Sequence, residues 1–326
     1  MEKIKIIMDV DTGIDDAIAI CLALGNESFE VLGLTTTYGN RPIEATTENT
    51  LKILELIGKE DIPVARGADK PIVKPYNPPE FSVVHGRDGL GDMKPPLPMP
   101  KIKPIEMSAV EFMAQQLKNS QEPITLVPVG PMTNVAALIL AHPELKPKIK
   151  QVVLMGGSTL KGNVTFVSEA NIMADPEAAH ILFDSGLKLF MTCLDATWKG
   201  YISFEELDEY KKNGNPLSDK ILGMCGIYEE HYKLRMKNPG IAMHDSLALA
   251  WLAKPELVKS ADYYVTVDID GRYTYGMTVT DVHNTLHKQP NATVSLDVDR
   301  EPFICMIKDA IALLNEEKQN RTEQEN

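Results

Sequence analysis

Residues 4–16 read IKIIMDVDTGIDD, and this stretch decides the fold. It begins as a short apolar run rich in isoleucine and ends in carboxylates, which is typical of a strand. A helical pattern follows from Asp15 to about Leu24 and stops at Gly25. Gly13 allows the chain to turn sharply between the strand and the helix. The segment therefore predicts the first strand, turn and helix of an alternating α/β sheet.

The same alternation continues along the chain. Further strands are expected at residues 29–37, 62–65, 124–129, 152–155 and 188–194, and helices at residues 42–57, 108–119, after 131 and at 176–184. Strands that alternate with helices predict a mostly parallel sheet with helices on both faces. The strand at 124–129 is a nearly continuous apolar run, as expected when both faces of a sheet are covered. We therefore expect a single open α/β domain, Rossmann-like, with a mostly parallel central sheet flanked by helices.

Two segments interrupt the alternation. Residues 66–104 are rich in proline and glycine and contain HGRDGLGD. A loop of this length in a compact domain is usually functional or disordered. Residues 203–236 look helical but less regular, and they predict a small helical cap.

The C-terminal part of the chain predicts partly antiparallel strands. The three candidate strands are at residues 263–269, 272–282 and 291–298. A last helix is expected over residues 302–314. We assign residues 1–315 to the α/β domain and expect the polar tail, residues 316–326, to fray.

Composition excludes several classes of protein. The 326 residues carry 33 Lys and Arg against 46 Asp and Glu, a formal net charge of -13, so a nucleic-acid partner is not expected. The four cysteines form no Cys-x-x-Cys pair, which disfavours zinc ribbons and indicates a reducing compartment. No apolar run is long enough to act as a secretory signal or to span a bilayer. The sequence therefore predicts a cytoplasmic protein without a membrane partner.

Asp9, Asp11, Asp15 and Asp16 place four carboxylates within eight residues, directly after a strand. Ligands of open α/β sheets bind outside the carboxyl ends of the strands. A simpler interpretation is that Asp15 or Asp16 only caps the helix. However, a helix N-terminus offsets only about 1 kcal/mol per charge, so a hard cation would relieve the repulsion better. Oxygen ligands without a nearby Cys or His pair favour calcium or magnesium over zinc.

Other strand and helix ends could complete such a site. Asp245 opens an apolar helix, where it is either a helix cap or a further ligand, and Val129 ends a strand with a free carbonyl. The segment after the strand at 152–155 carries Asn163, Glu169 and Asn171. Singly these are ordinary loop residues, but together they predict a polar pocket for the hydroxyls of a sugar.

Seven motifs in order resemble the inosine-uridine-preferring nucleoside hydrolase family. They are DVDTGIDDAIAI (9–20), TTTYGN (35–40), HGRDGLGD (85–92), LVPVGPMTNVA (126–136), MGGSTLKGN (155–163), EANIMADPEAA (169–179) and MHD (243–245). The resemblance runs from residue 6 to about 250 and more loosely to the end. It implies hydrolysis of the N-glycosidic bond of ribonucleosides, a bound Ca²⁺ and a homodimer or homotetramer. One departure is Thr12, where the family motif has proline, and it puts the rigidity of the loop in question.

The resemblance also implies a role for each matching residue. The metal ligands would be Asp11, Asp16, Asp245 and the carbonyl of Val129. The ribose would be bound by Asp15, Asn171 and Asn40, with Asn163 and Glu169 around its 5′ side. His85 and His244 would lie near the base.

These roles describe a mechanism. Calcium would position a water beside the anomeric carbon, and Asp11 would be the general base that takes its proton. Glu169 and Asn171 would stabilise the positive charge that develops on the ribose. His244 would protonate the leaving base or only position it.

Base preference is predicted from aromatic residues. Tyr228, His231 and Tyr232 have helical spacing on the expected cap, as core residues or as a lid over the base. The two tryptophans, Trp198 and Trp251, lie outside the His85 loop and the cap. Because purine-specific members of the family place tryptophans around the base, we expect pyrimidine nucleosides and inosine to be favoured. A broad or purine-preferring hydrolase is the alternative.

Two other functions fit parts of the sequence. A haloacid-dehalogenase-type phosphatase would use Asp9 as a nucleophile with magnesium, although no convincing late acidic pair follows an apolar strand. A calcium-dependent nucleoside-binding protein would show the same ligands. Phosphate release would identify the first, and an Asp11→Asn variant without a functional effect would identify the second.

Overall fold

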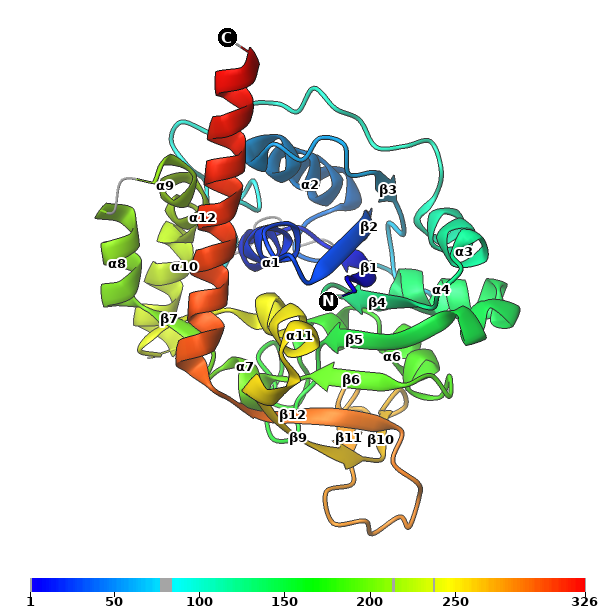
Figure 1. The fold of residues 1–326 in the computed structure, drawn as a ribbon. Helices are drawn as coiled ribbons and strands as arrows, with labels where there is room; N and C mark the ends of the chain where they lie inside the picture. Colours follow the sequence, from blue (N-terminus) through cyan, green and yellow to red (C-terminus); the bar gives the residue numbers. More distant parts are fainter. Residues whose placement is uncertain (1, 77–83, 213–214, 237, 326) are drawn as a thin grey trace.

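A central sheet of eight strands organises the molecule in a computed structural model that describes residues 2–76, 84–212, 215–236 and 238–325 (Figure 1). In spatial order the strands are β3 (Val64–Arg66), β2 (Phe29–Thr36), β1 (Ile4–Val10), β4 (Ile124–Pro128), β5 (Ile149–Met155), β6 (Leu189–Thr192), β12 (Ala292–Val298) and β9 (Val258–Tyr263). Neighbouring strands pair in parallel except β12 and β9, which are antiparallel. The predicted open, mostly parallel sheet is confirmed.

Helices cover both faces of this sheet (Figure 1). One face packs against α1 (Ile14–Leu24), α2 (Ile43–Ile57), α11 (His244–Ala253) and α12 (Arg300–Glu325), and the other against α3 (Ala109–Asn119), α4 (Thr133–Ala141) and α6 (Pro176–Phe183). Residues of β1 alternate between the two hydrophobic cores: Ile6 and Met8 belong to the first and Ile7 to the second. This two-residue period is what a strand buried on both faces requires.

A helical cap follows β6, as predicted. It comprises α8 (Phe204–Lys212), α9 (Pro216–Gly223), α10 (Cys225–His231) and a π-helical turn (Tyr232–Met236). A two-stranded antiparallel sheet, β7 (Tyr201–Ser203) with β8 (Gly240–Ala242), holds the two ends of the cap together. The cap therefore presents α10 beside the carboxyl ends of the central strands.

The C-terminal helix is longer than the sequence predicts. Instead of ending near Leu314, α12 continues to Glu325. Lys318 donates to the carbonyl of Leu56 at 2.6 Å, and Arg321 donates to the carbonyl of Gly58 at 2.6 Å. These cations bind the free carbonyls at the end of α2, which explains why the polar residues stay helical. The division into a domain over 1–315 and a tail over 316–326 stays a prediction.

Two more expectations change in detail. The predicted strand at 272–282 shortens to β11 (Thr278–Thr280), which pairs with β10 (Val265–Val267). Asp268 Oδ1 accepts hydrogen bonds from the N–H groups of Asp270 and Gly271, and these bonds close a turn between the two strands. Of the predicted loop 66–104, residues 77–83 lie outside the described residues. None of the helices in the described ranges has the length and apolarity of a membrane span.

Candidate active site

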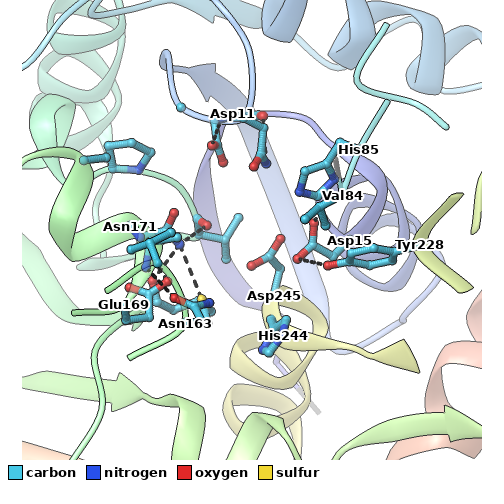
Figure 2. A pocket seen from close by; sticks show the side chains of 18 of the residues that line it. Asp11, Asp15, Val84, His85, Asn163, Glu169, Asn171, Tyr228, His244 and Asp245 are labelled. Carbon is cyan, nitrogen blue, oxygen red and sulfur yellow. Dashed lines mark hydrogen bonds and ion pairs between the residues drawn. The ribbon is translucent and has the colours of Figure 1, made fainter. Parts of the chain in front are cut away.

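A cavity of about 330 Å³ opens at the carboxyl ends of β1, β4 and β5 (Figure 2). The N-termini of α1 and α11, the loop around His85, and α10 complete its walls. Every predicted site residue except the fully buried Asp16 lines it, namely Asp11, Asp15, Asn40, His85, Val129, Asn163, Glu169, Asn171, Tyr228, Tyr232, His244 and Asp245. Residues far apart in the sequence thus meet in one place.

Three buried carboxylates form the acidic centre of this cavity. Asp15, Asp16 and Asp245 each offer one oxygen, and these oxygens lie within 4.8 Å of one another. They meet because α1 and α11 pack together with their N-termini at the same edge. The cluster brings together Asp16 and Asp245, for which a metal role is predicted, and Asp15, for which a ribose role is predicted; both roles stay predictions. Asp11 lines the same cavity, and its backbone N–H donates to Asp16 Oδ1 at 3.2 Å.

Asn40 connects Asp11 to this cluster. Its backbone N–H donates to Asp11 Oδ2 at 2.7 Å, and its side-chain amide donates to Asp16 Oδ2 at 3.2 Å. The N–H of Gly13 also donates to Asp16 Oδ2, at 2.9 Å. The turn after β1 and the loop after β2 therefore fix two carboxylates through backbone and amide donors.

Two glycines make room for the carboxyl group of Asp11. A Cβ at Gly39 would lie 2.0 Å from Asp11 Oδ2, and a Cβ at Gly130 would lie 2.7 Å from Asp11 Oδ1. Neither distance is possible for a real side chain. Sequence reasoning missed both glycines, although they lie in the loops that follow β2 and β4.

Thr12, which replaces the family proline, stabilises the turn between β1 and α1 through hydrogen bonds. Its hydroxyl shares a hydrogen bond of 2.7 Å with the hydroxyl of Thr50, and its carbonyl accepts from Asn49 at 3.2 Å. Both partners belong to α2. Side-chain contacts with a neighbouring helix thus fix the turn that the family proline would fix through its ring.

The electrostatics of the cluster suit a divalent cation. Burial raises the pKa of Asp16 to about 7, and burial with neighbouring carboxylates raises the pKa of Asp11 and of Asp245 well above the ordinary range. Asp15 Oδ1 is buried without a hydrogen-bond partner among the described residues. Buried carboxylates that lack donors are normally paired with a cation or protonated. The oxygen-only donor set therefore fits a hard cation.

Glu169 and Asn171 form the polar floor of the cavity (Figure 2). Glu169 caps α5 (Ala170–Ala174) and accepts from the N–H groups of Asn171 and Ile172 at 3.0 and 3.1 Å. Burial raises its pKa to about 7. The Asn171 amide donates to the carbonyl of Val129 at 2.7 Å, and a carbonyl oxygen keeps a second lone pair for another partner.

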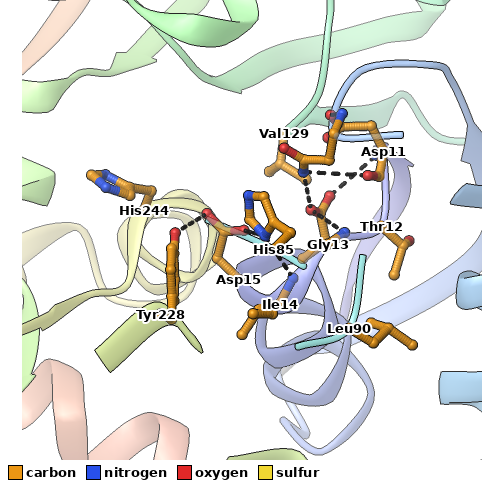
Figure 3. Close-up of polar contacts among 12 residues, drawn as sticks. Asp11, Thr12, Gly13, Ile14, Asp15, His85, Leu90, Val129, Tyr228 and His244 are labelled. Atoms are coloured by element: carbon orange, nitrogen blue, oxygen red, sulfur yellow. Dashed lines mark hydrogen bonds and ion pairs between the residues drawn. The ribbon is translucent and has the colours of Figure 1, made fainter. Parts of the chain in front are cut away.

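The opposite end of the cavity is built from two neutral imidazoles. His85 Nδ1 accepts from the N–H of Ile14 at 3.2 Å (Figure 3), and burial lowers the pKa of His85. His244 contacts the hydroxyls of Thr197 at 2.7 Å and Tyr232 at 3.0 Å. Burial lowers the pKa of His244 to about 4, so it is uncharged at neutral pH.

The cap contributes two tyrosines to this end. The hydroxyl of Tyr228 donates to Asp15 Oδ2 at 3.3 Å (Figure 3). The rings of Tyr228 and Tyr232 lie 5.0 Å apart at 75°. Both rings are buried. The cap is thereby connected directly to the acidic cluster.

Sequence reasoning missed two aromatic residues of the cavity. Trp198, set aside because it lies outside the His85 loop and the cap, lines the wall beside His244. Tyr76 also lines the cavity, with its ring 4.5 Å from that of Tyr38. Only the tertiary packing brings these residues to the site, since neither belongs to a motif that carries chemistry.

An open parallel sheet with buried carboxylates and a polar cavity at its carboxyl edge defines an α/β enzyme suited to a cation and a polyhydroxylated substrate. Residues 6–305 match the family described as inosine-uridine preferring nucleoside hydrolase, and the chain belongs to this family. It is therefore an N-glycosyl hydrolase that acts on nucleosides. Family membership sets aside the phosphatase and the non-catalytic binding protein.

Relatives and solved structures agree over nearly the whole chain. A pyrimidine-specific ribonucleoside hydrolase RihA of Escherichia coli (strain K12) is 42% identical over 94% of this chain and 98% of its own. A purine-preferring ribonucleoside hydrolase from Gardnerella vaginalis is 34% identical, with a TM-score of 0.88 over 95% of this chain and 99% of that chain. A plant nucleoside hydrolase is 31% identical, with a TM-score of 0.89 over 95% and 99%. The similarity confirms the predicted family and fold.

Proposed function

We propose that this enzyme cleaves ribonucleosides to ribose and free base, with pyrimidine nucleosides and inosine as the preferred substrates. The observation that carries the proposal is the cluster of Asp15, Asp16 and Asp245 inside a cavity lined with amides and imidazoles. The pyrimidine preference is supported by the 42% identity to the RihA hydrolase, which is described as pyrimidine-specific.

The proposed metal is calcium, held by Asp11, Asp16, Asp245 and the carbonyl of Val129. All four offer oxygen atoms, which calcium prefers. Calcium bound there would supply a lowered pKa for a coordinated water and would orient the ribose 2′- and 3′-hydroxyls. The orphaned oxygen of Asp15 supports a cation in this cluster, and Asp15 in turn is proposed to accept a hydrogen bond from a ribose hydroxyl.

The protein residues then perform the chemistry. Asp11, buried at the cavity wall, is assigned as the general base that accepts the proton of the water attacking the anomeric carbon. Asn171 and Asn40 orient the sugar, and Asn163 contacts its 5′ side. Glu169, at the floor of the cavity, stabilises the positive charge that grows on the ribose ring as the bond to the base breaks.

The leaving base is assigned to the end with His85 and His244. A neutral His244 is a weaker acid than an imidazolium, so this end suits bases that leave as stabilised anions and need little protonation. Tyr228 and Tyr232 would stack beside the base and exclude water.

A purine-preferring enzyme is the second candidate. The relative from Gardnerella vaginalis is described as purine-preferring and is 34% identical. Trp198 also lines the cavity, although both tryptophans lie outside the His85 loop and the cap.

A kinetic panel tests the proposed substrates. Uridine, cytidine, inosine, adenosine and guanosine would be compared by kcat/KM with calcium present. We expect uridine, cytidine or inosine to have the highest value. A large advantage of adenosine or guanosine would contradict the preference, and no cleavage of any of the five would contradict the proposed reaction.

The surroundings of the enzyme are proposed as well. We propose a homodimer or homotetramer in the cytoplasm. The cysteines are free thiols, which fits a reducing compartment. Size-exclusion chromatography with light scattering would give the mass, and a monomer at micromolar concentration would contradict the proposed assembly.

A further inference from the structure

Trp198 lines both the active-site cavity and a second cavity. It directly follows α7 (Leu194–Thr197), which begins just beyond the carboxyl end of β6. The second cavity measures about 590 Å³ and is lined on its far side by residues 158–162, Lys199, Asn238 and Leu296. Within the described ranges, Trp198 is the one residue that lines both cavities. Trp198 therefore lies where the two cavities approach each other.

The neighbours of Trp198 show which end of the active-site cavity it closes. Its ring centroid lies 5.0 Å from that of His244, with the two planes at 86°, and 5.9 Å from that of Tyr232. His244 and Tyr232 are joined by a hydrogen bond of 3.0 Å. These are the residues assigned to the leaving base under the proposed function. Trp198 thus bounds the base end of the cavity rather than the ribose end.

We propose that Trp198 is a specificity-determining residue that sets how large a base the enzyme accepts. The inference rests on the proposed function and adds the residue that limits the base. The indole is the largest side chain, and its truncation would enlarge the cavity at this end. Truncation of such a side chain should change the preference between a small and a large base on the order of tenfold or more, because the smaller base loses contacts and the larger base gains room.

The test compares inosine with uridine in Trp198→Ala and Trp198→Phe. In Trp198→Ala, the ratio of kcat/KM for inosine to that for uridine rises about tenfold or more. The smaller truncation in Trp198→Phe gives a smaller rise. An unchanged or lower ratio in a folded Trp198→Ala enzyme would overturn the proposal.

Trp251→Phe is the matched control. Trp251 lies in α11, is only 3% exposed and packs edge-on against Phe190 at 5.2 Å, outside both cavities. Its substitution should leave the ratio at the parental value. A parent enzyme that cleaves no ribonucleoside would contradict the proposed function, whereas an active parent with an insensitive Trp198→Ala ratio would contradict only this inference.

Fluorescence gives a second measurement if Trp198→Ala does not fold. The chain has only two tryptophans, so Trp251→Phe emits from Trp198 and Trp198→Phe emits from Trp251. Titration with uracil should change the emission of the Trp251→Phe protein and leave that of the Trp198→Phe protein unchanged. No response from Trp198, or a response from Trp251 alone, would count against the wall at the base end.

Discussion

At the scale of single residues, the position of the Asp11 carboxyl group depends on two neighbouring glycines as much as on its hydrogen-bond donor. One backbone donor, from Asn40, orients its carboxyl group, and the absence of side chains at Gly39 and Gly130 leaves room for both oxygens. Because the group is buried among other carboxylates, its affinity for protons and cations is high. Such a residue is suited to accept a proton during the reaction.

Substitution of Asp11 by asparagine tests that role. The amide is nearly the same size but cannot accept the proton, so we expect kcat for uridine to fall about 10²- to 10⁴-fold at saturating calcium. Exposed Asp262, in β9 at the far edge of the sheet, gives the matched Asp262→Asn control with parental activity. Parental kcat in a folded Asp11→Asn enzyme would contradict the assignment.

The predictable residues of the site are those whose motifs carry chemistry. Asp11, Asp15 and Asp16 could be predicted because they follow a strand within a few positions of one another, and they line or lie next to the cavity. Trp198 and Gly130 could not be predicted in the same way. Their place follows from how α7 and the end of β4 approach the cavity, which no local pattern encodes.

At the scale of elements, the periodicity of apolar residues predicts the central strands and helices well. Both faces of β1 are buried, so the run of apolar residues in the sequence was a strong signal. The end of α12 was predicted too early, since its polar residues have no apolar period. Contacts of Lys318 and Arg321 with the end of α2 stabilise that part instead, and such long-range contacts are invisible in one sequence.

The loop that follows β4 offers a test at this scale. In Gly130→Ala, the new Cβ would lie 2.7 Å from Asp11 Oδ1 and would displace the carboxyl group. We expect kcat/KM to fall by on the order of 10²-fold, as for other small misplacements of reacting groups. Circular dichroism should show that the fold is kept.

Gly226→Ala is the control for this substitution. A Cβ at Gly226, in α10, would meet nothing within 4 Å. Alanine there should keep activity and stabilise the helix by up to about 1 kcal/mol. Equal activities of the Gly130→Ala and Gly226→Ala enzymes would refute the close-packing argument.

At the scale of the whole molecule, buried acidic groups make the stability of the protein depend on its cation and on pH. Burial raises the pKa of Asp9, Asp16 and Glu169 to about 7 each. The folded pKa of each group exceeds its unfolded value of about 4, so the folded chain binds more protons than the unfolded chain between the two values. The free energy of unfolding therefore falls as pH rises from about 4 to about 7. His85 and His244, whose pKa is lowered, act in the opposite direction below about pH 6.5.

Thermal unfolding at pH 6 and pH 8 tests this linkage. Without metal, we expect Tm to be lower at pH 8 than at pH 6, because the buried carboxylates ionise without a partner. Calcium binds the ionised form, so the rise in Tm on adding calcium should be larger at pH 8. A calcium effect that is equal at both pH values, or larger at pH 6, would contradict the linkage.

The central claim is that the buried carboxylates hold a divalent cation on which cleavage depends. Elemental analysis of enzyme purified without chelator, followed by uridine hydrolysis before and after removal of metal, tests it most directly. We predict about one calcium per chain, loss of nearly all hydrolysis in the stripped enzyme, and recovery when calcium is returned. A stripped enzyme free of detectable metal that still hydrolyses uridine at the parental rate would contradict the account.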